Sequence, residues 1–307
     1  MEHMIIETSR LCKKYRGFEA VSDLDIQVKQ GSIYALIGLN GAGKTTLLKM
    51  LCGLALPTSG EITLFGENSP AGLRRACART GVMVETPAFL PYLSARDNLE
   101  YLRIQRGSGS KASVAAALDF VGLEDAGAKH FGKFSLGMKQ RLGLALAVMD
   151  GAELLLLDEP INGLDPMGIK EFRDIILHMN KERGTTVLIS SHILGELSQI
   201  ATEYGFLDHG KLLQHIRAAE LTERCRSVLY IEVDNAARAS ALLRSRHENI
   251  RLTFEGNLLQ ISECRDETSV LIQELMENSI AVSQVRQEGI GLEEYFIQLI
   301  QGGATNA

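Results

Sequence analysis

The chain contains the segment Ile33-Tyr-Ala-Leu-Ile-Gly38-Leu-Asn-Gly41-Ala-Gly43-Lys44-Thr45-Thr46-Leu47-Leu48, which predicts a buried strand, a glycine-rich turn and the start of a helix. Its pattern G-x-x-x-x-G-K-T lets consecutive backbone N–H groups converge on phosphate oxygens at the positive end of a helix dipole. We expect Lys44 to reach the β- and γ-phosphates of a nucleotide and Thr45 to hold Mg²⁺. The other candidate contacts of this phosphate-binding loop are Gly38, Asn40, Gly41, Ala42, Gly43 and Thr46.

The composition is that of a soluble globular protein, with 45% hydrophobic and 23% charged residues in 307. A net charge of −6 and scattered Lys and Arg residues argue against a nucleic-acid partner. The N-terminus does not have the pattern of a signal peptide, and the longest apolar run, Leu142–Met149, is far shorter than the roughly 20 residues of a membrane span. Five dispersed cysteines without a C-x-x-C pair are typical of reduced cytoplasmic thiols.

A second informative segment is Glu153-Leu-Leu-Leu-Leu-Asp158-Glu159-Pro160, which predicts a fully buried strand of parallel type that ends in acidic residues. Ligands bind beyond the carboxyl ends of such strands. We therefore expect Asp158 to hold Mg²⁺, directly or through water, and Glu159 to activate or orient the attacking water. An Asp-Glu pair alone is common in turns and caps, so this interpretation depends on the phosphate-binding loop.

Two further residues are candidate nucleotide contacts, each with a structural alternative. His192 follows the buried strand predicted at Thr185–Ser190, where it is placed to contact the γ-phosphate, although a lone His is more often structural. Tyr15 lies in the polar segment Lys13–Gly17, which favours a ring outside the core. Such a ring can stack on adenine, or it can simply be a half-exposed strand residue.

The rest of the chain predicts three structural regions. Apolar runs at Ile5-Ile6, Ala20–Val28 and Ile33–Ile37, separated by turns, predict a small antiparallel sheet. A helical region spans about 90–150, within a first domain of residues 1–220. Residues 221–307 follow a polar boundary segment and have the predicted order β-α-β-β-α-β plus a helix, which is the ferredoxin-like α+β arrangement.

One loop narrows the class of nucleotide-binding protein. Phe134-Ser135-Leu136-Gly137-Met138-Lys139-Gln140-Arg141 resembles the signature loop L-S-G-G-Q of ATP-binding cassette (ABC) ATPases, with Leu136 and Met138 as departures. The other elements of that family follow in order over about residues 4–220. They are Tyr15 at the adenine-stacking loop, Glu85 in place of the Q-loop glutamine, Asn162-Gly163-Leu164-Asp165 at the D-loop and His192 at the switch position.

The resemblance implies an α/β fold of the P-loop NTPase class, with a RecA-like core, an antiparallel β subdomain and a helical subdomain, here followed by the small C-terminal α+β domain. It implies an ATPase with ATP and Mg²⁺ as cofactors and Lys44, Glu159 and His192 as catalytic residues. Ser135, Gly137 and Asp165 are implied to contact ATP, the signature residues in the site of a second copy within an ATP-dependent dimer. Glu85 is implied to be a further Mg²⁺ ligand, beside Thr45 and Asp158.

Three segments resemble a narrower group, the bacitracin-resistance and lantibiotic-immunity export ATPases. They are Ser135-Leu-Gly-Met-Lys-Gln-Arg-Leu142, Glu85-Thr-Pro-Ala-Phe-Leu-Pro91 and Gly291-Leu-Glu-Glu-Tyr-Phe-Ile-Gln-Leu299. This resemblance implies an ATPase subunit in the cytoplasm, on the inner face of the membrane, that powers export of a peptide antibiotic by a separate integral-membrane permease. The alternatives are a soluble ABC-type ATPase that acts on nucleic acid or ribosomes, and a small-molecule kinase with a P-loop.

Overall fold

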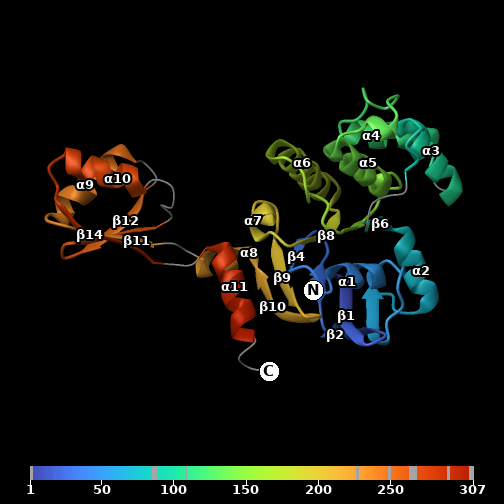
Figure 1. Cartoon of the computed structure of the whole chain (residues 1–307), viewed down its shortest axis with the longest axis horizontal. Coiled ribbons are helices and arrows are strands. Elements are labelled where there is room, and N and C mark those ends of the chain that lie inside the picture. The colour runs from blue at the N-terminus through green and yellow to red at the C-terminus, as the bar shows by residue number, and fades with distance from the viewer. Residues whose placement is uncertain are drawn as a thin grey trace. The chain divides into compact units, whose positions relative to one another are not determined.

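The computed structural model describes residues 3–84, 89–107, 109–225, 228–247, 250–262, 268–288 and 291–303. The contacts within the chain divide it into two compact units, residues 1–218 and 219–307. The first unit contains two sheets and the second unit contains one (Figure 1). Each unit has its own buried apolar cluster. Glu85 lies outside the described residues.

The first unit is built on a six-stranded sheet in the order β10-β9-β4-β8-β7-β6. Five strands are parallel, and β10 is antiparallel to β9. Every residue of β4, β7 and β8 is buried, because these central strands are covered on both faces. The strand bounds are β4 Ile33–Ile37, β6 Thr80–Met83, β7 Leu154–Leu157, β8 Thr186–Ser191, β9 Glu203–Asp208 and β10 Lys211–Arg217.

A four-stranded antiparallel sheet lies beside it, formed by β1 Met4–Tyr15, β2 Phe18–Leu24, β3 Gln27–Lys29 and β5 Ser59–Leu64. The strand β1 pairs with each of the other three. The placement of Ile33–Ile37 in this sheet was wrong, because those residues form β4 in the middle of the parallel sheet. Their continuous burial requires cover on both faces, which a sheet with one solvated face does not provide.

Both sheets of the first unit share one apolar core. Its members come from β1, β4, β7 and β8 and from the helix after β4, and include Ile6, Leu36, Leu48, Leu156 and Leu188, all fully buried. The helices of this unit are α1 Lys44–Leu51, α2 Pro70–Ala78, α3 Ala95–Arg106, α4 Lys111–Phe120, α5 Leu136–Val148, α6 Pro166–Arg183 and α7 Leu194–Leu197. The helices α3, α4 and α5 lie together on the β6 side of the sheet (Figure 1).

The second unit has the sheet order β12-β13-β11-β14, entirely antiparallel. One face of the sheet packs on α9 and α10 through buried residues that include Leu229, Leu243 and Leu271. The sequence of elements from β11 to β14 is β-α-β-β-α-β, as predicted. The bounds are α8 Ala218–Arg224, β11 Val228–Val233, α9 Ala236–Arg246, β12 Arg251–Glu255, β13 Leu258–Ser262, α10 Thr268–Glu277, β14 Val282–Glu288 and α11 Leu292–Gly303.

Among the helices that the structure describes, none is both long enough and apolar enough to cross a bilayer.

Candidate active site

The candidate active site lies at the carboxyl ends of three strands of the parallel sheet. The phosphate-binding loop follows β4, Asp158 and Glu159 follow β7, and His192 follows β8. The strand β8 lies between β4 and β7, so the three sets of residues meet at one edge of the sheet. This is the edge at which open α/β sheets bind ligands.

The phosphate-binding loop surrounds a hollow of about 230 Å³ at the N-terminus of α1. The Lys44 side chain is only 6% exposed, and its Nζ donates hydrogen bonds to the carbonyl oxygens of Gly38 (2.6 Å) and Leu39 (3.2 Å). Gly43 has a φ of +105°, and a Cβ there would collide with the carbonyl oxygen of Ala20. Only glycine fits this position, which keeps the backbone close enough to cradle phosphate.

The Asp158 carboxylate is held at both oxygens. The Thr45 hydroxyl donates to Oδ2 (2.7 Å), and the Ser190 hydroxyl donates to Oδ1 (2.7 Å). Oxygens of Thr45 and Asp158 are therefore adjacent, as a hard cation requires. Among the described residues, no cluster of three or more His, Cys, Asp or Glu side chains could hold a metal alone. The pair fits Mg²⁺, which usually takes one or two protein ligands and completes its shell with phosphate and water.

Glu159 lies between two cationic or polar side chains. Its Oε1 is 3.0 Å from Lys44 Nζ, and its Oε2 is 2.8 Å from Nδ1 of His192. The side chains of Glu159 and His192 are 22% and 29% exposed, and Glu159 helps to line the hollow, with its Oε1 buried. All three residues that we expected to be catalytic are thus brought together.

Ser190 joins this group, although the sequence analysis did not assign it a role. Besides its bond to Asp158, its Oγ accepts a hydrogen bond from the backbone N–H of Glu159 (2.9 Å). The register of β7 and β8 pairs Leu157 with Ile189 and so places the following residues side by side. In the sequence, the only sign of this contact was a polar residue at the end of β7 and another at the end of β8. These two residues can be predicted to touch only when β7 and β8 are known to be neighbours.

Hydrogen bonds of Ser191, one of them with Glu196, hold the loop that carries His192. The Ser191 hydroxyl contacts Oε2 of Glu196 (3.1 Å) and accepts a hydrogen bond from the backbone N–H of Ile193 (3.0 Å). Burial raises the pKa of the Glu196 carboxyl, against the opposing effect of the Ser191 hydrogen bond. This pair connects α7 to the end of β8.

Tyr15 and Phe18 form the aromatic part of the region. Tyr15 is half exposed at the end of β1, with Lys13 Nζ 5.0 Å from its ring centroid. Its cross-strand partner Phe18 is 59% exposed and lines the hollow of the phosphate-binding loop, whereas Tyr15 is not among the described residues that line it. Sequence reasoning missed Phe18. The turn at Arg16-Gly17 was the available signal, because a two-residue hairpin loop places the flanking residues opposite each other.

The signature loop and the D-loop contact each other within the chain. Ser135 caps α5 by accepting a hydrogen bond from Met138 N–H (3.3 Å), and Asp165 caps α6 by accepting one from Gly168 N–H (3.1 Å). The Leu136 side chain lies against the D-loop, because a Cβ on Gly163 would be 3.2 Å from its Cδ2.

Gly137 also faces the D-loop, since a Cβ there would be 3.8 Å from Leu164 Cδ2. The described lining of the phosphate-loop hollow includes neither Ser135, Gly137 nor Asp165. Within one copy of the chain, the signature loop and the D-loop thus contact each other, and their candidate residues are not among the described residues that line this hollow with Lys44 and Thr45.

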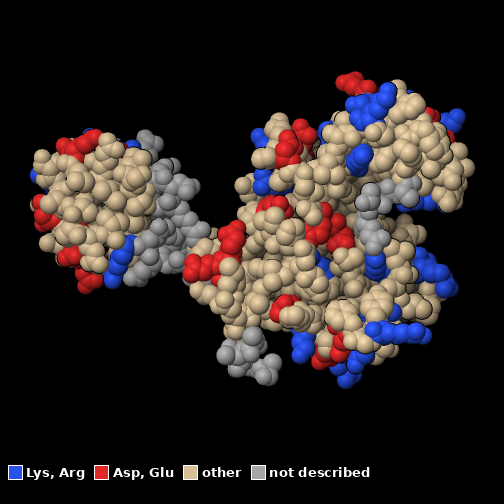
Figure 2. Space-filling model, viewed as in Figure 1, with Lys and Arg blue, Asp and Glu red and all other residues tan. Residues whose placement is uncertain are grey.

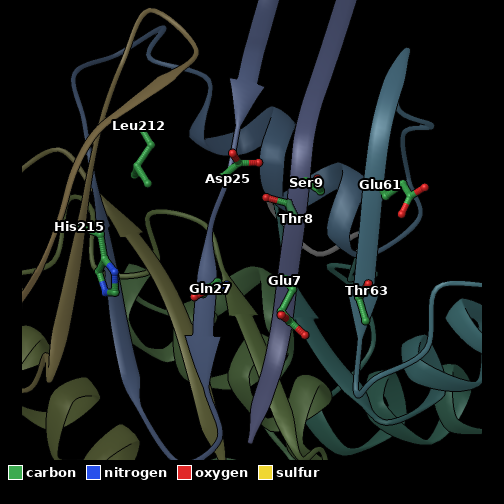
Figure 3. Close-up of a pocket in the computed structure, with 9 residues that line it drawn as sticks. All are labelled: Glu7, Thr8, Ser9, Asp25, Gln27, Glu61, Thr63, Leu212 and His215. Atoms are coloured by element: carbon green, nitrogen blue, oxygen red, sulfur yellow. The ribbon is translucent and has the colours of Figure 1, made fainter. Parts of the chain in front are cut away.

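A different hollow, of about 520 Å³, lies over the antiparallel sheet and β10 (Figure 3). It contains three carboxylates, which come from separate strands or turns, and none of the motif residues (Figure 3). The nucleotide site is therefore not located there. The lining residues are Glu7, Thr8, Ser9, Asp25, Gln27, Glu61, Thr63, Leu212 and His215.

Comparison with known proteins identifies the family of this chain. Residues 21–162 match the ABC transporter family. The chain is 39% identical to the bacitracin transport ATP-binding protein BcrA of Enterococcus faecalis, over 97% of both chains. The chain belongs to the ABC transporter ATP-binding family.

A further relative and a solved structure are also similar to this chain. The lantibiotic transport ATP-binding protein SrtF of Streptococcus pyogenes is 40% identical over 209 residues, which are 68% of this chain and 89% of SrtF. The dimeric ATP-binding cassette MJ0796 bound to ADP and Pi has the same fold, with a TM-score of 0.63 and 21% identity over 69% of this chain and 98% of that chain. Both matches span roughly the length of one cassette.

The protein is therefore an ATP-binding, ATP-hydrolysing ABC transporter subunit. The match over 21–162 includes the phosphate-binding loop, the signature loop and both acidic residues after β7. This favours the transporter subunit over a soluble ABC-type ATPase on nucleic acid or ribosomes, and over a small-molecule kinase. On the face of the cassette shown in Figure 2, Lys and Arg side chains lie in separate groups among acidic ones rather than as one basic surface.

Proposed function

We propose that the protein is the ATPase subunit of an exporter for a peptide antibiotic of the bacitracin or lantibiotic type, and that a separate integral-membrane permease provides the pathway. The similarity to BcrA extends over 97% of the chain, and SrtF is a second relative named for peptide-antibiotic transport. In this proposal the subunit binds the permease at the inner face of the membrane, from the cytoplasm.

One observation carries the proposed chemistry, the position of Glu159 between Lys44 and His192. The reaction is attack of a water oxygen on the γ-phosphorus, with cleavage of the bond to the bridging β–γ oxygen and release of ADP and phosphate. Glu159 accepts a proton from that water, or orients it. Lys44 binds the β- and γ-phosphates through charge-assisted hydrogen bonds, and His192 contacts the γ-phosphate.

The remaining site residues bind the nucleotide and the metal. Thr45 and Asp158 would hold Mg²⁺, which, when bound, neutralises charge on the β- and γ-phosphates. Glu85 is proposed as a further oxygen ligand, directly or through water. Tyr15 is proposed to stack on adenine, beside Phe18, which lines the phosphate-loop hollow. The backbone N–H groups of residues 38–46 cradle the phosphates.

A complete ATP site is proposed to require two copies of the chain. Ser135, Gly137 and Asp165 are not among the described residues that line the phosphate-loop hollow of their own copy, and Ser135 marks the N-terminus of α5, where an anion is favoured. In the dimer, these residues of each copy close the ATP site of the other.

Co-purification from membranes tests this proposed function. A tagged subunit extracted in mild detergent should bring with it a hydrophobic protein with several membrane spans. Lys44→Ala should retain that partner, because permease binding does not use the phosphate loop. Recovery of ribosomes or DNA in place of a membrane protein would contradict the proposal.

Antibiotic survival then tests the cargo. Cells that contain the subunit and its permease should tolerate bacitracin or a lantibiotic better than cells with Glu159→Gln, which keeps the complex but stops hydrolysis. Equal sensitivity of the two strains to every peptide antibiotic tried would exclude this class of cargo.

A further inference from the structure

Ser190 is a fully buried residue of β8 whose hydroxyl contacts both acidic residues after β7. Its Oγ donates to Asp158 Oδ1 (2.7 Å) and accepts from the backbone N–H of Glu159 (2.9 Å). A hydroxyl has one proton to donate and lone pairs to accept, so one Ser190 rotamer satisfies both partners at once.

The contact with Glu159 holds an unusual backbone conformation. Glu159 has a φ of +46°, in the left-handed region where a residue with a Cβ is disfavoured by about 1–2 kcal/mol. Two hydrogen bonds fix this peptide segment: the N–H of Glu159 donates to Ser190, and its carbonyl accepts from Asn162 N–H (3.2 Å). The conformation directs the carboxylate between Lys44 and His192.

The contact with Asp158 fixes the rotation of its carboxylate. Ser190 occupies Oδ1, and Thr45 contacts the other oxygen, Oδ2. Asp158 N–H also donates to the carbonyl oxygen of Met83 (2.8 Å), so the backbone of this residue is anchored to β6. Ser190 therefore helps to hold the side-chain torsion that keeps Oδ2 next to Thr45.

We propose that Ser190 is a positioning residue that orients two acidic groups at once. These are Asp158, which would bind the metal, and Glu159, which would act on the attacking water. The inference rests on the roles given to Asp158 and Glu159 in the proposed function. A single buried hydroxyl would then couple metal binding to water activation by acting through Asp158 and Glu159.

The test compares Ser190→Ala with Thr186→Val in the full chain. Thr186 is also fully buried, lies at the other end of the same strand, and uses its hydroxyl to accept from Gly31 N–H (2.9 Å). Both variants lose one buried hydroxyl of β8, but only Ser190→Ala changes the active site. Circular dichroism confirms that each variant is folded.

Two quantities should change in Ser190→Ala. We expect kcat for ATP hydrolysis to fall about 100-fold, because the water-orienting carboxylate is misplaced, while KM for ATP stays within about threefold, because the phosphate loop is intact. The affinity of the ADP-bound protein for Mn²⁺, followed by the electron paramagnetic resonance of free Mn²⁺, should fall about tenfold through loss of a hydrogen bond to a charged group. Thr186→Val should change neither quantity.

Ser190→Thr keeps the hydroxyl and should recover most of both quantities. If kcat and Mn²⁺ affinity of Ser190→Ala match those of Thr186→Val, the proposal is wrong. It is also wrong if Ser190→Thr, folded, is as defective as Ser190→Ala, because the hydroxyl is then not the cause. If Ser190→Ala does not fold, Ser190→Cys replaces it, since a thiol is a weak donor of similar size, and wild-type behaviour of that variant overturns the proposal.

Failure of the proposed function would look different. A wild-type protein without Mg²⁺-dependent ATPase activity, or one in which Glu159→Gln hydrolyses ATP normally, would remove the assigned roles whatever Ser190 does. An active wild type, an inactive Glu159→Gln and a normal Ser190→Ala would instead reject only the role of Ser190.

Discussion

Lys44 Nζ lies 3.0 Å from Oε1 of Glu159, so the cation of the phosphate-binding loop is paired with the carboxylate that follows β7. The pair connects β4 and β7, which β8 separates in the sheet. In the proposed mechanism the two residues face different groups, since Lys44 binds phosphate and Glu159 acts on water. Their effects on binding and on turnover should therefore be separable.

The first prediction separates these effects. Lys44→Ala should weaken ATP binding about 100-fold, because a charge-assisted hydrogen bond to the phosphates is lost. Glu159→Gln should leave binding intact and reduce turnover at least about 100-fold, because the amide cannot accept the proton. Titration with a fluorescent ATP analogue and a phosphate-release assay measure the two effects. Unchanged affinity in Lys44→Ala would contradict the loop assignment, and near-normal turnover in Glu159→Gln would move the role of base to His192.

A second prediction concerns the backbone of Glu159. At a φ of +46°, Glu159→Gly should be more stable than Glu159→Ala by about 1 kcal/mol, because glycine adopts this region without the steric clash of a Cβ. Both variants lack the carboxylate, so the difference between their free energies of unfolding reports the cost of the left-handed backbone conformation alone. Urea unfolding measures it. A more stable Glu159→Ala would show that residue 159 is not held in the left-handed region in solution.

The third prediction follows from the raised pKa of Glu196. Burial is the main cause, Glu159 adds to it, and Ser191, His192 and Arg173 oppose it. The folded protein therefore holds a proton that the unfolded chain has lost, and stability falls as pH rises from the ordinary glutamate pKa through the raised one. Glu196→Gln cannot ionise and should keep that stability.

Melting temperatures of wild type and Glu196→Gln, recorded between about pH 4 and about pH 8, check this sign. The two proteins should be similar at the acid end, and the variant should become relatively more stable as pH rises. If the difference between the two melting temperatures does not depend on pH, or if the wild type becomes relatively more stable as pH rises, burial is not the main influence on the pKa of Glu196.

A fourth prediction concerns the second unit. A chain that ends near Ala219 should still fold and hydrolyse ATP, because the motif residues of the first unit precede that point and the two units have separate apolar clusters. The SrtF match, which spans 209 residues, points the same way. The ATPase rate of the shortened chain is compared with that of the same chain carrying Glu159→Gln. A short chain that is folded but inactive would show that ATP hydrolysis by the first unit requires the second unit.

The fifth prediction tests the shared site. Lys44→Ala and Ser135→Arg should each be inactive alone, but a mixture should recover at most about a quarter of the wild-type rate, because half of the dimers are mixed and each has one intact site. Strict coupling between sites would remove even this activity. Light scattering of Glu159→Gln with ATP is therefore the control, and a monomer there would mean that the permease brings the two copies together.

Local patterns were enough to predict much of this protein. The phosphate-binding loop and the Asp158-Glu159 strand end are contiguous in sequence, and their chemistry follows from residue type and spacing. The alternation of elements from β11 to β14 also followed from short apolar runs and turns. These features do not depend on which strands become neighbours.

Features that depend on strand neighbours could not be predicted in the same way. The contact between Ser190 and Asp158 requires β8 to lie beside β7, across 32 residues of chain. The position of Ile33–Ile37 in the parallel sheet depends on what covers its second face. The left-handed backbone of Glu159 has no local signal, because glutamate rarely adopts it and nothing beside it in the sequence requires it.

Position 18 is suited to a fluorescent probe of the cassette. The chain contains no tryptophan, so excitation at the red edge of protein absorption finds no indole anywhere in it. Phe18 is largely exposed and lines the hollow of the phosphate-binding loop, where a larger ring can be accommodated on the solvent side. Phe18→Trp would thus install a single indole at the hollow of the phosphate-binding loop, and binding, hydrolysis and product release could be followed in real time without a chemical label.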